Sequence, residues 1–311
     1  MPPGLKVMAD NPTPDVAVAP PLAVPGVMAA VGHRALEGVY RGLPSSRLML
    51  MVSLDDGIQI DDLKPIPVLL AGLHLQAAKV HKARGQGVVQ LAVHPLASRA
   101  LFGMPAAEVS GAALDVAAAL GRPAARLHEQ VAEATNWSAA FACVVRYLQG
   151  ARRAEPVRPE VAHAWQLLAR SRGRMPVGYV AQQVGLTPRH LATLFQREVG
   201  HTTKTAAMLM RFEYVTRRIA GAGYSSGPVD LARIAVESGF ADQAHLTRQF
   251  ARFAGVSPTT WLAEDFRNVQ DSLQTYGSGW AGDDYDSGIL GGNDGSNLDG
   301  IAPGSAFGAA V

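Results

Sequence analysis

Two stretches of this chain repeat one pattern: AQQVGLTPRHLATLFQREVGHT (residues 181–202) and AVESGFADQAHLTRQFARFAGVS (residues 235–257). Each begins with Ala, three further residues, Gly and an apolar residue. A Leu follows six or seven residues after that Gly, and a Phe stands four residues beyond the Leu. Each copy then reaches a second Gly five residues past the Phe, and a Thr or Ser two residues later. So detailed an internal repeat predicts one structural unit that is used twice.

The first copy is typical of a helix-turn-helix. A short helix is expected to end at Gly185, where a residue that tolerates positive φ lets the chain turn sharply. Thr187 and Pro188 suit the N-cap and the first position of a second helix. The inward face of that helix would carry Leu191, Leu194 and Phe195. Its outward face would carry Arg189, Ala192, Thr193 and Gln196.

The second copy follows the same plan with different polar residues. Asp242 can cap its second helix. The inward residues would be Leu246, Phe250 and Phe253, and the outward ones Gln243, His245, Thr247, Arg248 and Arg252. Side chains that can contact base edges and phosphates would thus lie on a helix that fits a major groove.

At these residues the chain resembles the AraC/XylS family of bacterial transcription regulators. The resemblance covers about Arg158 to Phe266, including Gly239-Phe240, Leu246-Thr247-Arg248-Gln249-Phe250 and Gly255-Val256-Ser257-Pro258. Arg211 stands where the family carries an arginine. Trp261 departs from the family's usual tyrosine, and Leu262 from the basic residue that often follows it.

The resemblance implies an all-α DNA-binding domain at about 160–266. Two helix-turn-helix units, about 177–199 and 231–254, would lie at the ends of a connecting helix of about Thr203 to Ala220, so that two recognition helices face successive major grooves. The expected DNA-binding residues are Thr187, Arg189, His190, Ala192, Thr193 and Gln196 in the first unit, and Gln243, Ala244, His245, Thr247, Arg248 and Arg252 in the second. Arg197 and Lys204 are expected to contact backbone phosphates.

The charge distribution agrees with a nucleic-acid partner. The 311 residues have a net charge of only +2. From Arg158 to Glu264, however, 13 Lys and Arg stand against 7 Asp and Glu, whereas the chain after Phe266 has one Arg and six Asp. The basic part coincides with the repeat. The alternative is that these charges are ordinary solvated helix faces.

The rest of the chain predicts an α+β protein with a small β-rich, cupin-like N-terminal domain. Residues 1–26 are Pro-rich and 267–311 are rich in Gly, Asp and Ser, so both are expected to be unstructured. A sensor or dimerisation domain is expected at 27–151, and a linker at 152–159. Within the sensor or dimerisation domain, strands are predicted at 27–31, 47–54, 68–75 and 87–93, and helical segments at 100–103, 114–120 and 124–150.

This N-terminal half also resembles a sensor-type domain found in one branch of the same family. The similar runs are Gly87 to Pro95, Ala100 to Glu108, and Leu114-Asp115. In relatives this domain binds a small molecule, mediates dimerisation, or both, so the resemblance leaves a small-molecule effector and a homodimer open and names no effector-binding residue. Apolar residues at helical intervals between 124 and 150 predict either a dimer contact or a helix packed on its own domain.

Other residues argue against different classes of protein. Cys143 is the single cysteine, which excludes an internal disulfide and favours a small core residue. No apolar run is long enough to span a membrane, and we expect a cytoplasmic protein. His74, His81 and His94 lack the spacing of a metal site, so neither a metal nor a cofactor is expected. Gly223-Tyr-Ser-Ser-Gly227 spells a nucleophile elbow but follows a helix, so no catalytic residue is expected.

The sequence therefore predicts a sequence-specific transcription regulator, not an enzyme. The resemblance favours an activator that contacts double-stranded DNA and RNA polymerase. One alternative is a DNA-alkylation repair protein with a methyl-accepting domain, but that class needs several cysteines. The other is a non-DNA interaction protein on the same scaffold, which would lack the outward polar residues found here.

Overall fold

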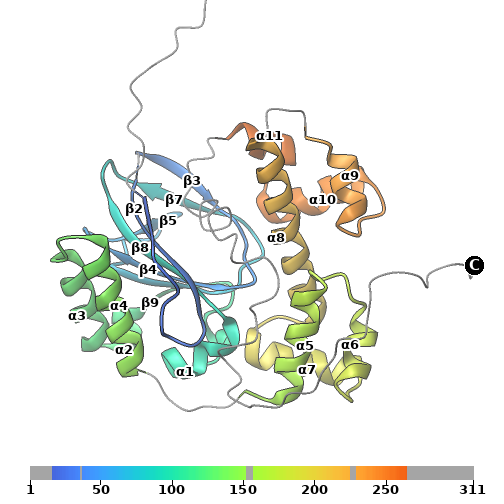
Figure 1. The fold of residues 1–311 in the computed structure, drawn as a ribbon, viewed down its shortest axis with the longest axis horizontal. Helices are drawn as coiled ribbons and strands as arrows, with labels where there is room; N and C mark the ends of the chain where they lie inside the picture. The colour runs from blue at the N-terminus through green and yellow to red at the C-terminus, as the bar shows by residue number, and fades with distance from the viewer. Residues whose placement is uncertain (1–15, 36, 152–156, 225–228, 265–311) are drawn as a thin grey trace, which may run out of the picture.

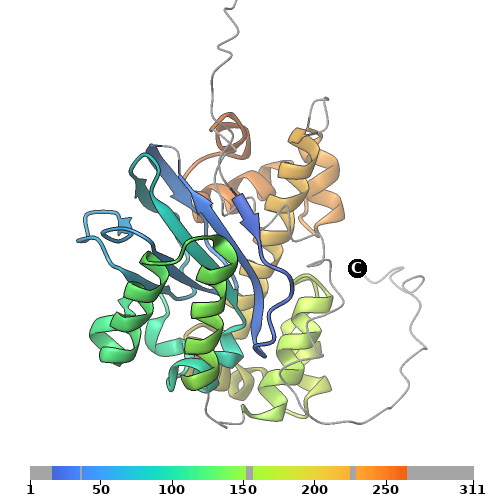
Figure 2. The same cartoon turned by 60° about the vertical axis from the view of Figure 1, so that its left-hand side comes forward.

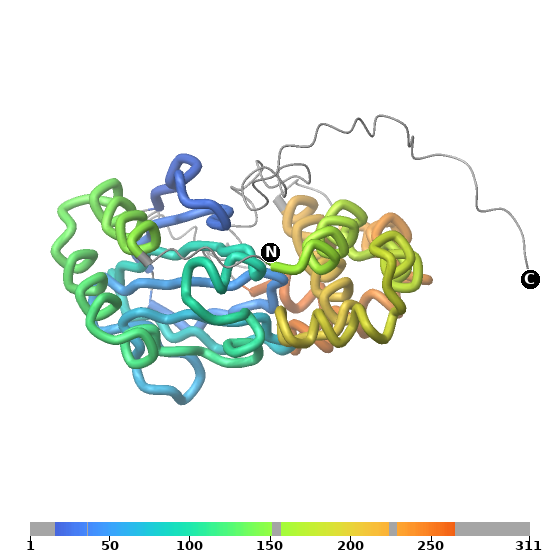
Figure 3. Tube along the Cα trace, turned by 90° about the horizontal axis from the view of Figure 1, so that it is seen from below, coloured from blue at the N-terminus to red at the C-terminus, as the bar shows by residue number. Residues whose placement is uncertain are grey.

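The computed structural model describes residues 16–264, apart from residue 36, residues 152–156 and residues 225–228. A β-rich half and an all-helical half lie side by side (Figures 1 and 3). The expected α+β class is therefore confirmed, with the β-rich domain first along the chain. Most of the expected linker and all of the C-terminal tail lie outside the described residues.

The β-rich half consists of two antiparallel sheets. The larger one has the strand order β1-β2-β8-β4-β6-β9 and the smaller one the order β3-β7-β5. The strands of the larger sheet are β1 (Val16–Val18), β2 (Val27–Arg34), β8 (Gly87–Val93), β4 (Leu48–Ser53), β6 (Val68–Ala71) and β9 (Ala113–Asp115). Those of the smaller sheet are β3 (Gly38–Gly42), β7 (Ala78–Lys82) and β5 (Gln59–Ile60). The central strand β8 reads GVVQLAV and is buried throughout, as expected of a strand that is covered on both faces.

Four α-helices and two short 3-10 helices belong to the described part of the β-rich half, and Figure 2 shows α3 and α4 against the larger sheet. The helical elements are η1 (Pro95–Ala97), α1 (Ser98–Phe102), η2 (Ala106–Val109), α2 (Val116–Leu120), α3 (Arg122–Ala132) and α4 (Trp137–Ala151). The expected apolar segment 124–150 is thus two helices. The apolar residues that predicted a dimer contact are buried within the domain at Leu127, Val131, Phe141 and Leu148, and only Val145 is partly buried. This burial favours the alternative, helices that pack on their own domain.

The structure corrects several sequence-based boundaries. The segment Val16–Val18 was expected to be unstructured, but it pairs with residues 31–33 of β2 as an edge strand. Because backbone hydrogen bonds hold this strand, its side chains show no clear sequence pattern. The smaller sheet was missed because its strands mix polar and apolar residues, as in AKVHK of β7. Leu114 lies in β9 and not in a helix. The helix begins only after Asp115, whose carboxylate accepts hydrogen bonds from the backbone N–H groups of Ala117 and Ala118.

The helical half is built around the 22-residue helix α8 (Thr203–Tyr224), which stands between two groups of shorter helices (Figure 1). The helices before it are α5 (Pro159–Arg170), α6 (Val177–Gln183) and α7 (Pro188–Val199). Those after it are α9 (Leu231–Glu237), α10 (Gln243–Ala254) and α11 (Pro258–Ala263). No helix in the described part of the chain is both long and apolar enough to cross a membrane.

The two halves share one continuous apolar core. Buried residues of the sheets, such as Leu91, belong to the same cluster as Trp165 of α5 and Phe195 of α7. At the junction the His94 ring meets the edge of the Trp165 ring at 5.5 Å between centroids, and Trp165 stacks on Phe195 at 6.2 Å. The β-rich half is thus packed against the helical half through apolar contacts as well as polar ones.

Candidate nucleic-acid interface

The sequence repeat is a structural repeat. In the first unit, α6 ends before Gly185 at φ +69°, and the backbone N–H of Leu186 donates to the carbonyl of Ala181 at 2.9 Å. In the second unit, α9 ends before Gly239 at φ +76°, and Phe240 donates to Ala235 at 3.0 Å. The same bond therefore closes the first helix of each unit, and a left-handed glycine makes the turn in both.

The second helix of each unit is capped by its own side chains. The Thr187 hydroxyl accepts the N–H of His190 at 3.2 Å, and the Asp242 carboxylate accepts that of His245 at 2.6 Å. α7 ends at Gly200 and α10 at Gly255, both in the left-handed conformation. Cap and stop signals fix these two helices locally, so their start and end follow from the sequence.

The inward faces of α7 and α10 are fully packed. The buried residues are Leu191, Leu194, Phe195 and Val199 in α7, and Leu246, Phe250, Phe253 and Ala254 in α10. The Phe250 ring lies between Phe212 of α8 and Trp261 of α11, at 5.3 Å and 5.6 Å between centroids. Trp261 therefore takes part in the core of the second unit, although it departs from the family's usual tyrosine.

The opposite faces of the two helices carry the residues expected to bind DNA. Thr187, Arg189, His190, Thr193, Gln196 and Arg197 are exposed on the first unit, and Gln243, Ala244, Arg248 and Arg252 on the second. Ala192, His245 and Thr247 are partly buried, and Lys204 is exposed at the start of α8. In the part of the chain that the structure describes, the β-rich half covers none of the exposed residues, which leaves both outward faces open to a partner.

Four of these side chains also have contacts within their own helix or turn, and Thr187, which caps α7, is one of them. The Thr193 hydroxyl donates to the carbonyl of Arg189 at 3.1 Å, and the Gln196 amide donates to the carbonyl of Gly200 at 2.6 Å. The His245 ring rests edge-on against Phe240 at 5.3 Å between centroids. Arg189 and Arg248 make no such contact with the residues that the structure describes, and both are exposed.

Arg211, on α8, connects the two units. Its guanidinium donates to the carbonyl of Gly173, before α6, at 2.7 Å, and it lies over the Phe240 ring, after α9, at 5.7 Å. Burial, together with the nearby charge of Arg174, lowers the pKa of Arg211 below its ordinary value. The sequence marked this arginine only through the resemblance, because nothing local indicates that it contacts both units.

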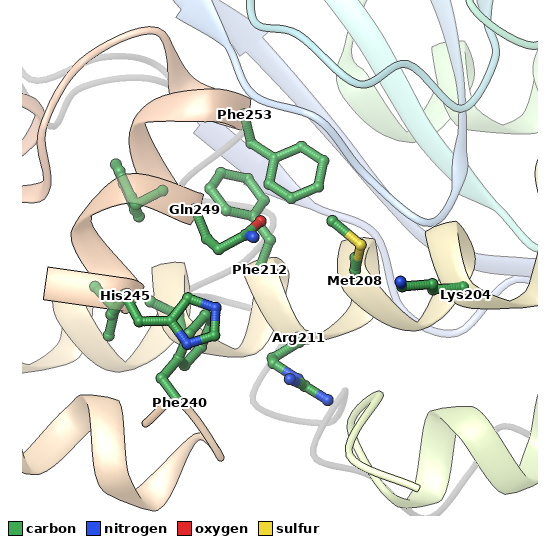
Figure 4. Close-up of a pocket in the computed structure, with 11 residues that line it drawn as sticks. Lys204, Met208, Arg211, Phe212, Phe240, His245, Gln249 and Phe253 are labelled. Atoms are coloured by element: carbon green, nitrogen blue, oxygen red, sulfur yellow. The ribbon is translucent and has the colours of Figure 1, made fainter. Parts of the chain in front are cut away.

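A hollow of about 280 Å³ lies between α8 and α10 (Figure 4). Its apolar lining includes Met208, Phe212 and Phe253, and its polar side chains are Lys204, Arg211, His245 and Gln249. Figure 4 shows Lys204 and Arg211 on the connecting helix, with His245 and Gln249 on the second recognition helix. Two cationic side chains, Lys204 and Arg211, thus lie beside α10 at this hollow.

Among the residues that the structure describes, no three His, Cys, Asp or Glu side chains are grouped as metal ligands. Cys143 is a free, buried residue of α4. Part of Gly223-Tyr-Ser-Ser-Gly227 lies outside the described residues.

The family model described as "Helix-turn-helix domain" matches residues 180–264, the region that contains both recognition helices. No curated protein matches the chain significantly in sequence. Among solved structures, the chain is similar to a variant of apo ToxT from Vibrio cholerae, at 12% identity and a TM-score of 0.46 over 76% of this chain and 96% of that one. The chain is also similar to unsaturated fatty acid bound ToxT from Vibrio cholerae, at 11% identity and a TM-score of 0.44 over 82% of this chain and 97% of that one. A third similar structure is the C-terminal domain of AraT, a response regulator from Geobacillus stearothermophilus. Its sequence identity is 20% and its TM-score 0.32, over 36% of this chain and 89% of that one.

Proposed function

We propose that this chain, whose residues 180–264 are an AraC-type helix-turn-helix domain, is a sequence-specific transcription regulator that reads two successive major grooves. The observation that carries the proposal is the pair of outward faces on α7 and α10, each with an exposed arginine, in two helix-turn-helix units that one connecting helix joins. At about 1.5 Å per residue, the 22 residues of α8 span ~33 Å. That length is close to one turn of the duplex, roughly 34–36 Å.

The chemistry of the exposed residues supports base reading as well as backbone binding. An arginine can make two parallel hydrogen bonds to a guanine edge, and a glutamine can do the same to an adenine. Arg248 and Gln243 offer these groups on α10, and Arg189 offers one on α7. Lys204 lies beside the hollow between α8 and α10, where a cation can neutralise a backbone phosphate without reading a base.

The experiment is a selection of bound fragments from genomic or random DNA with the full-length protein. We expect a motif with two half-sites about one helical turn apart, each weakened by alanine at one recognition helix. Arg189→Ala should relax one half-site and Arg248→Ala the other. A selection that yields no motif, or a motif that both variants leave unchanged, would exclude sequence-specific recognition by these helices.

A second part of the proposal is a small-molecule effector bound between the two sheets. A cavity of about 60 Å³ is lined there by His33, Met51, Val80 and Gln90, among others. His33 is buried, burial and the charge of Lys82 lower its pKa well below the ordinary value, and its Nδ1 has no described hydrogen-bond partner. A neutral histidine whose Nε2 faces Lys82 Nζ at 3.4 Å carries its proton on Nδ1, so a small molecule with an acceptor oxygen would satisfy it.

Acetate and other small carboxylates are suitable probes of this cavity. They should raise the melting temperature of the wild type and not that of His33→Phe, which fills the space and removes the donor. Equal shifts in both proteins would place binding elsewhere.

Within the same proposal the regulator acts in the cytoplasm, as an activator that contacts RNA polymerase. A homodimer stays a prediction, which sedimentation can test.

A further inference from the structure

The β-rich half forms hydrogen bonds with one buried carboxylate in the middle of the connecting helix. Glu213 of α8 accepts hydrogen bonds from the Ser45 hydroxyl at 2.7 Å, the Ser46 N–H at 3.0 Å and the Ser46 hydroxyl at 2.7 Å. The guanidinium of Arg47 lies 3.5 Å from it. Burial alone would raise the pKa of Glu213, but Arg47, the two serines and Arg217 together lower it, so the carboxylate is ionised at neutral pH.

The same half also holds the end of the first recognition helix. Arg99 of α1 pairs with Glu198 of α7 at 2.9 Å. Just beyond α7, the His201 ring lies 2.9 Å from the Ser110 hydroxyl and 2.9 Å from the carbonyl of Leu73. These contacts join the last turn of α7 to the η2 region and to the chain after β6.

The end of the second recognition helix is held in a corresponding way. Arg41 of β3 donates to the carbonyl of Ala254 at 2.9 Å, and the backbone N–H of Ala77 donates to the carbonyl of Phe253 at 2.9 Å. The β-rich half thus makes polar contacts with the end of α7, the middle of α8 and the end of α10. None of them covers the outward faces, which argues against a cap that blocks DNA.

We propose that Glu213 is a positioning residue for DNA recognition: with Ser45, Ser46 and Arg47 it makes the β-rich half a brace that fixes the two recognition helices relative to each other. This inference rests on the proposed function. Without the brace, α8, the chain after it and the bridging Arg211 are left to link the two units, so the second unit is held less firmly relative to the first. With the brace, the chain accepts one spacing between half-sites, since each added base pair moves a half-site by about 3.4 Å and turns it by about 35°.

The first test measures the brace without DNA, in the full-length chain. Spin labels on Arg197→Cys and Arg252→Cys, in a Cys143→Ala background, report the distance between the last turns of α7 and α10. We expect a narrow distance distribution in the parent and a broader one in Glu213→Gln. Ser46→Ala removes only one of the donors, so it keeps the test decisive if Glu213→Gln does not fold.

The matched control is Glu129→Gln. Glu129 is exposed on α3, which lies on the side of the β-rich half away from the helical half (Figures 1 and 3). It should leave the distribution unchanged. Distributions in Glu213→Gln and Ser46→Ala that are as narrow as the parent's would overturn the brace, whatever the protein does with DNA.

The second test uses the selected site with one or two base pairs inserted or deleted between its half-sites. The wild type should lose about tenfold in affinity for a change of one base pair, a loss comparable to a mismatched position. Glu213→Gln should lose less than about threefold, with similar affinity for the original spacing. Equal penalties in both proteins would overturn the brace, whereas a wild type with no selected site would instead refute the proposed function.

Discussion

The guanidinium of Arg41 on β3 forms a two-pronged ion pair with the carboxylate of Glu264, just after α11: Nε donates to Oε2 at 2.8 Å and Nη2 donates to Oε1 at 2.7 Å. Its remaining terminal nitrogen donates to the carbonyl of Ala254. A single side chain thus holds both the end of α10 and the end of α11. Such planar recognition of a carboxylate is a property of arginine that lysine does not share.

Arg41→Lys should therefore destabilise the protein although the charge is kept. The pair is about one-third exposed, so solvent screens it and we expect a loss of only about 1 kcal/mol in the free energy of unfolding. Urea denaturation measures the loss. Arg233→Lys is the control, because Arg233 is more exposed and lies 4.0 Å from Glu237, so its unfolding curve should overlay the wild type. Equal effects of the two substitutions would show that the two-pronged ion pair of Arg41 adds no stability.

Two glycines with the same backbone conformation should respond differently to alanine. Gly185, in the turn of the first unit, has φ +69° and open space where a Cβ would stand. Gly173, before α6, has φ +70°, but its Cβ would overlap the carbonyl oxygen of Ala207 in α8. Gly185→Ala should cost about 1–2 kcal/mol from backbone strain alone.

Gly173→Ala should cost more than Gly185→Ala, because α8 must also move and Arg211 donates to the carbonyl of residue 173. Thermal unfolding of the two variants compares them directly. If both lose the same stability, strain at positive φ is the whole effect and the close approach to α8 is relaxed without cost.

Stability should fall at acidic pH because of buried neutral histidines. His94 is buried, its Nδ1 accepts the N–H of Leu96 at 3.1 Å, and burial together with the charge of Arg47 lowers its pKa to about 3. In the unfolded chain the pKa is near 6.5, so between about pH 6.5 and 3 the unfolded state binds more protons than the folded one. Stability is therefore lost as the pH falls through this window.

His94→Asn should make that decline shallower, because asparagine keeps an acceptor for Leu96 and cannot titrate. Below pH 6, the slope of unfolding free energy against pH should fall by about 1 kcal/mol per pH unit, the contribution of one proton. Urea denaturation at pH 7, 6 and 5 measures the slope. Identical slopes in the two proteins would mean that His94 takes up its proton in the folded state.

How far the sequence predicts the structure depends on whether a feature is local. α7 and α10 follow from Thr187, Asp242 and the glycines that end each helix, because caps and stops act within one turn. The brace does not follow: Ser45 and Glu213 are 168 residues apart, and nothing near Ser45 announces the contact. The one available signal is an acidic residue within the apolar side of α8, between Phe212 and Val215.

The sheets show the same division. β8 was predicted because a fully buried strand reads as a continuous apolar run. β1, β3 and β5 were missed because their partners, and not their own side chains, define them as strands. The residues expected to bind DNA are mostly exposed, but exposure does not separate those that read bases from those that contact phosphates.

Base reading can be separated from backbone binding with two alanine substitutions in the full-length chain. Arg248 is exposed on the outward face of α10, where an arginine can form two hydrogen bonds to a guanine edge, worth roughly 1–3 kcal/mol of discrimination. Lys204 is exposed at the start of α8, outside both recognition helices, where only a phosphate contact is expected. Arg248→Ala should therefore relax the preference at one or two positions of one half-site. Lys204→Ala should weaken binding to all sequences alike and reduce the slope of log affinity against log salt by about one.

Binding to every single-base variant of the selected site decides between the two roles. If the losses in Arg248→Ala are uniform across the variants, this arginine contacts phosphate and the bases are read by other side chains of α10.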